Sequence, residues 1–142
     1  MAKSIVLQIA MKAVIVHNGK VLIMRETADH DTNTQVGRYQ MPGGRLEPGE
    51  VFNKALDREI FEETGLKVKQ LYPILVGEWR PVIKGAPHQI VGVFMVCQVS
   101  TAKIKLSEEH DDYKWIYAKD YKKYDIPPPD WQAIAEYAKN LA

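Results

Sequence analysis

The chain has 142 residues, with 19 Lys and Arg against 18 Asp and Glu, so its formal net charge is +1. This balance gives no reason to expect nonspecific binding to nucleic acid or to a membrane surface, and no apolar run approaches the length that spans a bilayer. Hydrophobic residues make up 46% of the chain, as in ordinary globular proteins. We therefore expect one domain over residues 1–142, located in the cytoplasm. The single cysteine, Cys97, lies in an apolar run and is expected to be a buried strand residue.

The first part of the chain predicts strands joined by loops. Residues 4–16 are rich in Val, Ile and Leu and predict a strand. The dipeptide Asn18–Gly19 predicts a tight hairpin, because both positions of such a turn need a positive φ, so residues 21–26 should return as an antiparallel partner. The polar segment 27–38 and the glycine-rich segment 43–49 predict loops, with a short strand or turn between them.

The second part of the chain predicts two helices and three further strands. Residues 51–64 predict a helix that ends at Gly65. A closing helix is expected near the end of the chain, with Asp130 as its N-cap. This closing helix is expected over 131–141, and three strands are expected over 66–79, 88–99 and 113–117. Strands mixed with two helices favour an α/β fold in which helices flank a mixed sheet.

The first helix carries an unusual set of acidic residues. At about 100° per residue, three glutamates fall on the same side as Phe52 and its apolar neighbours, whereas a solvated acidic face would lie opposite. These glutamates are Glu59, Glu62 and Glu63. Inward carboxylates repel one another and need Arg pairing, a raised pKa or a divalent cation. Arg58 is one counter-charge, with Glu50 as its plausible partner, and oxygen-only ligands suit Mg²⁺ or Mn²⁺.

The same segment resembles the signature of the Nudix hydrolases, G-x5-E-x7-R-E-U-x-E-E-x-G-U, where U is aliphatic. Every fixed position is filled, by Gly44, Glu50, Arg58, Glu59, Ile60, Glu62, Glu63, Gly65 and Leu66. The resemblance implies an α/β/α sandwich around a mixed sheet, with a loop–helix–loop box. It also implies Mg²⁺-dependent hydrolysis of a nucleoside diphosphate linked to another group, with Mn²⁺ as a substitute cation.

The resemblance also implies roles for individual residues. Glu59, Glu62 and Glu63 would be metal ligands and catalytic residues, joined by the carbonyl of Gly43. Three residues would support the loop–helix geometry, namely Gly44, Glu50 and Arg58. The general base differs among members of the family, and it is either a box glutamate or an acid on a later loop, where Glu108 and Glu109 are the candidates.

Three residues outside the box are candidate substrate contacts. Arg25 ends the second predicted strand, where similar proteins place a phosphate-binding Arg, although a surface Arg is the alternative. Tyr39 would touch the nucleobase or pack. His110 lies in "EEHDDYKWI", which resembles a segment of GDP-mannose mannosyl hydrolases whose His is a general base, but the segment also serves other Nudix proteins as the entry to a strand. Trp115 and Tyr117 are expected in the core.

The box does not fix the substrate. The small chain most resembles the MutT-like branch, which cleaves (d)NTPs or oxidised dNTPs to a monophosphate and pyrophosphate. The alternatives are ADP-ribose or a nucleotide sugar, for which Pro81 is a weak indication, and a non-catalytic nucleotide-binding module. The expected partner is a small nucleotide, the charge argues against a long nucleic-acid footprint, and a homodimer stays open.

Overall fold

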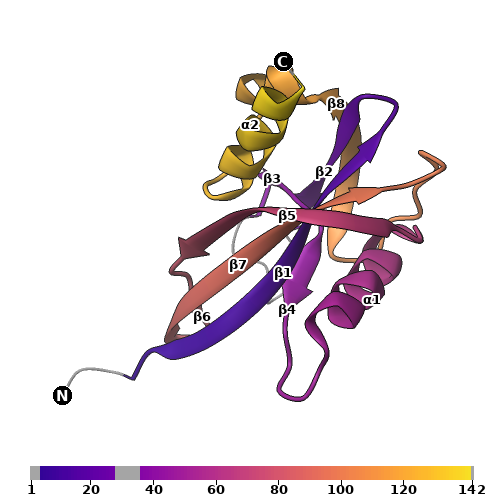
Figure 1. Ribbon diagram of the computed structural model, residues 1–142. Coiled ribbons are helices and arrows are strands. Elements are labelled where there is room, and N and C mark those ends of the chain that lie inside the picture. Colours follow the sequence, from indigo (N-terminus) through magenta and orange to yellow (C-terminus); the bar gives the residue numbers. More distant parts are fainter. Residues whose placement is uncertain (1–3, 28–35, 142) are drawn as a thin grey trace.

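The computed structural model describes residues 4–27 and 36–141 (Figure 1). The predicted loop over 27–38 therefore lies largely outside the described residues. The strands are β1 (Val6–His17), β2 (Lys20–Glu26), β3 (Tyr39–Gln40), β4 (Gly43–Arg45), β5 (Lys69–Trp79), β6 (Val82–Ile83), β7 (Ala86–Gln98) and β8 (His110–Tyr117). The helices are α1 (Phe52–Thr64), the 3-10 helix η1 (Ala118–Lys123) and α2 (Asp130–Asn140). No helix among the described residues is long and apolar enough to cross a membrane.

The strands form a mixed sheet in the order β3-β2-β1-β7-β5. β1 and β7 run parallel, from Val6 opposite His88 to Val16 opposite Gln98, and the other pairs are antiparallel. The β1–β2 hairpin is confirmed, with φ of 49° at Asn18 and 76° at Gly19, because an Asn-Gly turn matches the twist of the flanking strands. β8 pairs with β2 and β4 with β1, so two segments distant from each other in the sequence lie beside the first hairpin.

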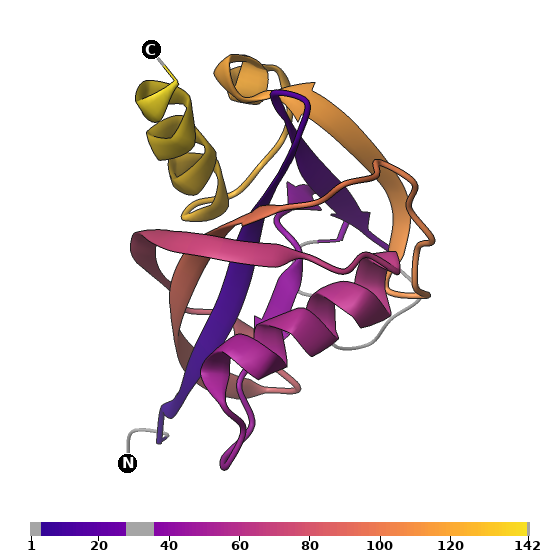
Figure 2. The same cartoon turned by 45° about the vertical axis from the view of Figure 1, so that its right-hand side comes forward.

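The two helices cover opposite faces of the sheet (Figures 1 and 2). Successive strand residues point to opposite faces, so the side chains of β1 contribute to a hydrophobic core on each face of the sheet. On one face, Leu56 and Ile60 of α1 pack in a cluster with Ala13 and Ile15 of β1. On the other face, Ile134 of α2 packs in a cluster with Val14 of β1 and Phe94 of β7. The expected α/β/α sandwich is therefore confirmed.

Two expectations about the end of the chain were wrong. The N-cap of α2 is Pro129, with no side-chain cap hydrogen bond, and Asp130 is the first helical residue. The carboxylate of Asp130 is instead buried and binds Nζ of Lys12 at 2.7 Å and the backbone N–H of Met41 at 2.8 Å. Tyr117 is 52% exposed rather than in the core, and its ring lies under Nζ of Lys20.

Segment bounds also differ from the expected ones. The glycine-rich segment expected as a loop contains β4, which pairs with β1 so that Gly43 lies opposite Lys12. Strand β8 begins at His110, earlier than the predicted 113. Cys97 and Trp115 lie where expected, since Cys97 is fully buried and Trp115 packs against the α1-side core.

Candidate active site

Helix α1 presents part of its acidic set inward. It begins after Val51 and ends at Gly65, whose φ of 74° allows its N–H to bond the carbonyl of Phe61, the usual role of glycine after a helix. Its buried residues are Ala55, Leu56, Ile60, Glu63 and Thr64. The inward face is therefore centred on Leu56 and Ile60. Phe52, by contrast, is 54% exposed. The hydroxyl of buried Thr64 donates to the carbonyl of Ile60 at 2.6 Å.

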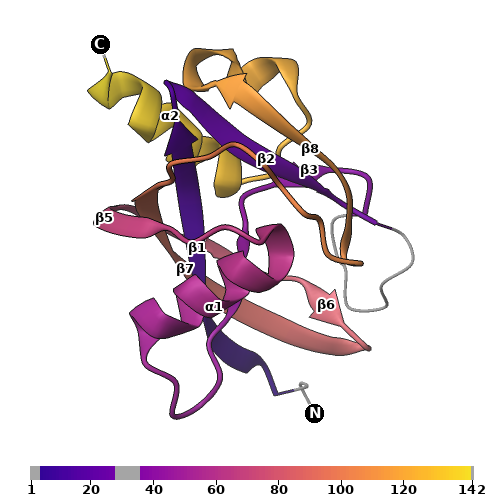
Figure 3. The ribbon, with the colours of Figure 1, turned by 90° about the vertical axis from the view of Figure 1, so that its right-hand side faces the viewer.

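A cavity of about 240 Å³ opens beside this helix. The polar part of its wall comes from β2, β3, β4, α1 and the residue before β8, and the apolar part from β1, β5, β6 and β7. The polar lining consists of Glu26, Gln40, Gly43, Gly44, Glu47, Glu59, Glu63 and Glu109, and the apolar lining of Ala10, Trp79, Pro81, Ile83 and Ile90. Two cations, Lys12 and Arg45, complete the lining. Figure 3 views the molecule from the side of α1, with β1 and β7 behind the helix.

Glu63 is the most buried acid of the cavity, with 6% of its surface exposed. Its Oε2 accepts the backbone N–H of Gly43 at 2.9 Å. Burial raises the pKa of Glu63 well above its usual range, and the neighbouring carboxylates Glu59 and Glu109 raise it further, against the opposing effects of Gly43 and Lys12. Without a cation, Glu63 is therefore an electrostatically costly residue.

Glu59 lies one helical turn before Glu63 on the same side of α1. Burial raises its pKa, and the nearby Arg58 opposes this shift. Gly44 leaves the space that the carboxylate of Glu59 occupies, because a Cβ at Gly44 would lie 2.6 Å from that carboxylate. The structure thus brings Gly44, Glu59 and Glu63 of the box together.

Glu62 points away from this group. Its side chain is 57% exposed and pairs with Nη1 of Arg58 at 3.2 Å, so the prediction that it faces inward was wrong, and it does not line the cavity. Arg58 also binds Glu50 at 2.8 Å, which confirms that predicted pair. The pKa of Glu50 is lowered by the N–H of Glu47 and by Arg58. Arg58 therefore ties the loop before α1 to the outer side of the helix.

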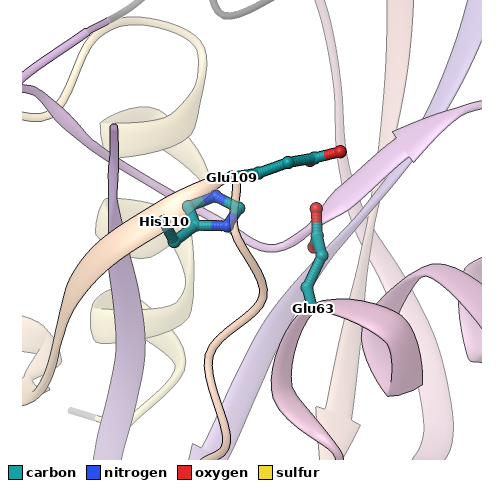
Figure 4. Close-up of side chains that lie close together, drawn as sticks. All are labelled: Glu63, Glu109 and His110. Atoms are coloured by element: carbon teal, nitrogen blue, oxygen red, sulfur yellow. The ribbon is translucent and has the colours of Figure 1, made fainter. Parts of the chain in front are cut away.

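Glu109, the residue before β8, lines the cavity, and His110 is the first residue of that strand. The backbone carbonyl of Glu109 accepts the N–H of Thr27 at 3.0 Å, which fixes this end of β8 beside β2. His110 is 5% exposed, and its Nε2 lies 3.4 Å from Nε2 of Gln40. One donor atom each from Glu63, Glu109 and His110 lie within 4.8 Å of one another (Figure 4). The other candidate base, Glu108, is exposed and lies outside the cavity lining.

Arg25 and Tyr39 do not line the cavity, whereas their strand neighbours Glu26 and Gln40 do. Side chains alternate along a strand, so Arg25 and Tyr39 point to the other side. Nε of Arg25 donates to Asp111 at 2.7 Å. The hydroxyl of Tyr39 donates to Asp112 at 2.5 Å, and burial together with this carboxylate raises the pKa of Tyr39 to about 12.

Sequence reasoning missed several lining residues, among them Lys12, Arg45 and Trp79. Lys12 interrupts an apolar strand, which was a usable signal, because a charged residue in a buried strand needs a partner. Arg45 follows the two box glycines and bonds Gln8 at 3.1 Å. Trp79 gave no local signal. It reaches the cavity because Gly92, on the neighbouring strand, has no Cβ to meet its ring.

The donor set fits a divalent cation. Three carboxylates converge at one end of the cavity, from Glu59, Glu63 and Glu109. Burial of like charges is unfavourable unless an opposite charge lies between them. Carboxylate oxygens are the ligands that Mg²⁺ and Mn²⁺ prefer, so the residues present match the kind of cation that the acidic helix predicted.

Comparisons with known proteins agree with this geometry. A family model described as the NUDIX domain matches residues 7–137. The nucleoside triphosphatase NudI of Escherichia coli O1:K1 is 28% identical over 122 residues, which cover 79% of this chain and 84% of that protein.

Solved structures share the fold at lower identity. The MutT protein from Methanosarcina mazei Go1 superposes with a TM-score of 0.85 at 20% identity, over 99% of both chains. An ADP-ribose pyrophosphatase from Streptococcus suis 89-1591 gives a TM-score of 0.66 at 16% identity, over 94% of this chain and 91% of that one. At such identities these likenesses establish the fold alone. With the family model spanning the sheet, α1 and most of α2, the chain belongs to the Nudix hydrolase family and is a hydrolase of phosphoric anhydride bonds.

Proposed function

We propose that this protein is a Mg²⁺-dependent pyrophosphohydrolase that cleaves a (d)NTP, or an oxidised dNTP, to the monophosphate and pyrophosphate. The observation that carries the proposal is a single cavity whose wall combines an acidic part, with the carboxylates of Glu59, Glu63 and Glu109, and an apolar part that includes Trp79. Such a cavity offers separate places for a phosphate chain with its cation and for a nucleobase.

The acidic end supplies the chemistry. Glu59 and Glu63, with the carbonyl of Gly43, would hold Mg²⁺, which when bound neutralises phosphate oxygens and lowers the pKa of the attacking water. A cavity carboxylate, Glu59 or Glu109, accepts the proton of that water as it attacks phosphorus and the P–O–P bond breaks. Lys12 and Arg45 lie in the same lining and are suited to bind phosphate oxygens.

The outer network supports this geometry rather than binding the cation. Glu50 and Glu62 both pair with Arg58 on the outer side of α1. Exposed ion pairs contribute little to stability, so their proposed role is to hold the loop between β4 and α1, and with it Gly43 and Gly44 of β4, at the right distance from the helix. Glu62 would therefore act as a positioning residue.

The apolar end would receive the base. Trp79, Pro81 and Ile83 line this end, and an aromatic face binds a flat heterocycle by stacking. The similarity to a protein named nucleoside triphosphatase supports a triphosphate substrate. A second candidate is ADP-ribose or a nucleotide sugar, which is favoured by the position of Pro81 in the cavity wall.

The test is product analysis with Mg²⁺ and a panel of (d)NTPs, 8-oxo-dGTP, ADP-ribose and GDP-mannose. We expect a monophosphate and pyrophosphate from a triphosphate. Release of AMP and ribose phosphate from ADP-ribose alone would refute the triphosphate proposal in favour of the second candidate. Glu63→Gln should lose most turnover, whereas the matched control Glu108→Gln, an exposed acid near the same strand entry, should keep it. Equal loss in both variants would contradict the site.

A further inference from the structure

Lys12 is a buried cation in the lining of the cavity, and 7% of it is exposed. Ala10 lines the cavity from the same face of β1, because side chains two residues apart on a strand share a face. On the neighbouring strand β7, Phe94 lies opposite Lys12, and Ile90 of the same strand lines the cavity. Nζ of Lys12 is 5.5 Å from the centroid of the Trp79 ring. The ammonium therefore lies beside the apolar part of the wall, to which the proposed function assigns the nucleobase.

The two cations of the lining differ in how their charges are balanced. Lys12 donates to Oδ2 of buried Asp130 at 2.7 Å. Arg45 bonds the neutral amide of Gln8 at 3.1 Å, and among residues 4–27 and 36–141 it has no carboxylate partner. Both cations suit phosphate by sign, but a phosphate gains most from a cation whose charge is not already compensated. Arg45 is therefore the better phosphate ligand, and the compensated ammonium of Lys12 is better suited to a neutral acceptor.

The ammonium of Lys12 keeps donors for such an acceptor. A lysine ammonium offers three N–H donors, and Asp130 takes one of them. Within the described parts of the chain, the further contacts of Nζ are the ring faces of Trp79 and Phe94, at 5.5 and 5.9 Å, which attract a cation but are not hydrogen-bond acceptors of ordinary strength. A buried donor without an acceptor is costly. A ligand that places an oxygen beside Nζ therefore gains affinity.

The carboxylate of Asp130 fixes the direction of this donor. Its Oδ2 also accepts the backbone N–H of Met41 at 2.8 Å, so it is held from the side of the sheet as well as by α2. A lysine stem is flexible, and its ammonium keeps one position only when a fixed partner holds it. Asp130 does not line the cavity. Its part in binding is therefore to position Lys12 rather than to contact the substrate.

Nucleobases differ at the atom that such a donor would meet. Guanine and thymine carry a carbonyl oxygen at position 6 of the purine and position 4 of the pyrimidine, whereas adenine and cytosine carry an amino group there. An ammonium has no acceptor, so an amino group beside Lys12 would set donors against donors. A carbonyl oxygen at the same place would accept from Nζ.

We propose that Lys12 is a specificity-determining residue, which donates to the carbonyl oxygen at position 6 of a purine or position 4 of a pyrimidine. The substrates are then nucleotides of guanine, hypoxanthine, thymine or uracil rather than of adenine or cytosine. The inference rests on the proposed function, which sets the base against Trp79. Arg45 then serves the phosphate chain.

The test uses two pairs of nucleotides that differ at this position. dIMP and dAMP differ by a carbonyl or an amino group at position 6, and dUMP and dCMP differ in the same way at position 4. Each is titrated into the full-length protein with Mg²⁺ and followed by NMR, and none has an anhydride bond to hydrolyse. We expect dIMP to bind about 10-fold or more tightly than dAMP, and dUMP than dCMP. A pair without this preference, or with the opposite one, would overturn the proposal.

Variants show whether Lys12 causes the preference. In Lys12→Met, the two members of each pair should bind equally, whereas a merely structural role of Lys12 would lower all four affinities together and keep the preference. The double variant Lys12→Met/Asp130→Asn leaves no uncompensated buried charge, so it serves if the single variant does not fold. The matched variant Arg45→Gln should weaken all four monophosphates alike and keep the preference. A preference that survives the loss of Lys12 would refute the assignment.

Failure of this inference and failure of the proposed function are distinguishable, because binding of a monophosphate needs no hydrolysis. Release of pyrophosphate from triphosphates, with equal binding within both pairs, would leave the proposed function standing and remove the role of Lys12. A preference that depends on Lys12, without hydrolysis of any compound in the panel, would do the reverse.

Discussion

The buried ion pair between Lys12 and Asp130 provides a strong test of how the C-terminal helix is joined to the sheet. Their side chains are 9% and 5% exposed, and Nζ and Oδ2 are 2.7 Å apart. Asp130→Asn keeps the shape of the side chain and an oxygen for the N–H of Met41, but it removes the charge that balances Lys12. The variant therefore isolates the electrostatic part of the contact.

The size of the effect follows from burial. Removing one partner of a buried pair costs about 3–5 kcal/mol, because the other charge stays uncompensated. Nζ of Lys12 lies 5.5 Å from the ring centroid of Trp79 and 5.9 Å from that of Phe94, and these contacts persist in the variant, so we expect the lower end, about 3 kcal/mol. For a chain of this size, such a loss lowers the melting temperature by about 10 °C.

The assay is urea unfolding at pH 7, followed by circular dichroism, on four proteins: the unchanged chain, Asp130→Asn, Lys12→Met and the double variant Lys12→Met/Asp130→Asn. Replacing both charges removes the uncompensated one, so the double variant should recover most of the stability that Asp130→Asn loses. A loss below about 1 kcal/mol in Asp130→Asn, or a double variant less stable than that single variant, would refute the reasoning.

Three further predictions concern the cavity. Burial raises the pKa of Glu63 far above its ordinary 4.5, so the native state holds a proton that the unfolded state releases. Stability is then full below about pH 4.5 and falls as pH rises through the native pKa. Glu63→Gln should remove this fall in cation-free thermal unfolding from pH 4 to 8, and parallel curves for the two proteins would contradict it. Gly44→Ala places a Cβ 2.6 Å from the carboxylate of Glu59 and should lower kcat about 100-fold with unfolding little changed; near-normal kcat would show that Glu59 can move without penalty. Trp79→Ala should raise KM about 10-fold through lost stacking, while kcat changes less. An unchanged KM in steady-state kinetics would show that the nucleobase of the substrate does not bind against Trp79.

Features set by neighbouring residues were predictable from the sequence. The Asn18–Gly19 turn and the stop at Gly65 follow from backbone preferences at one or two positions, and both lie where expected. The partner of Asp130 lies 118 residues away, and no local pattern names it. An N-cap was the best local interpretation of an Asp after three prolines, but the buried charge of Lys12 outweighed the capping preference, because a capping bond is worth only about 1 kcal/mol.

The direction of each box glutamate was the least predictable feature of the site. Neighbouring residues on a helix lie about 100° apart, so Glu62 and Glu63 cannot both face the cavity. Residues four apart share a side, which places Glu59 with Glu63 and puts Glu62 beside Arg58, as observed. The sequence-based reasoning took Phe52 as the inward reference, and Phe52 proved to be exposed. The pair Leu56 and Ile60, buried together, is the better reference, because two aliphatic residues in adjacent turns lose more by exposure than one residue at the first position of a helix.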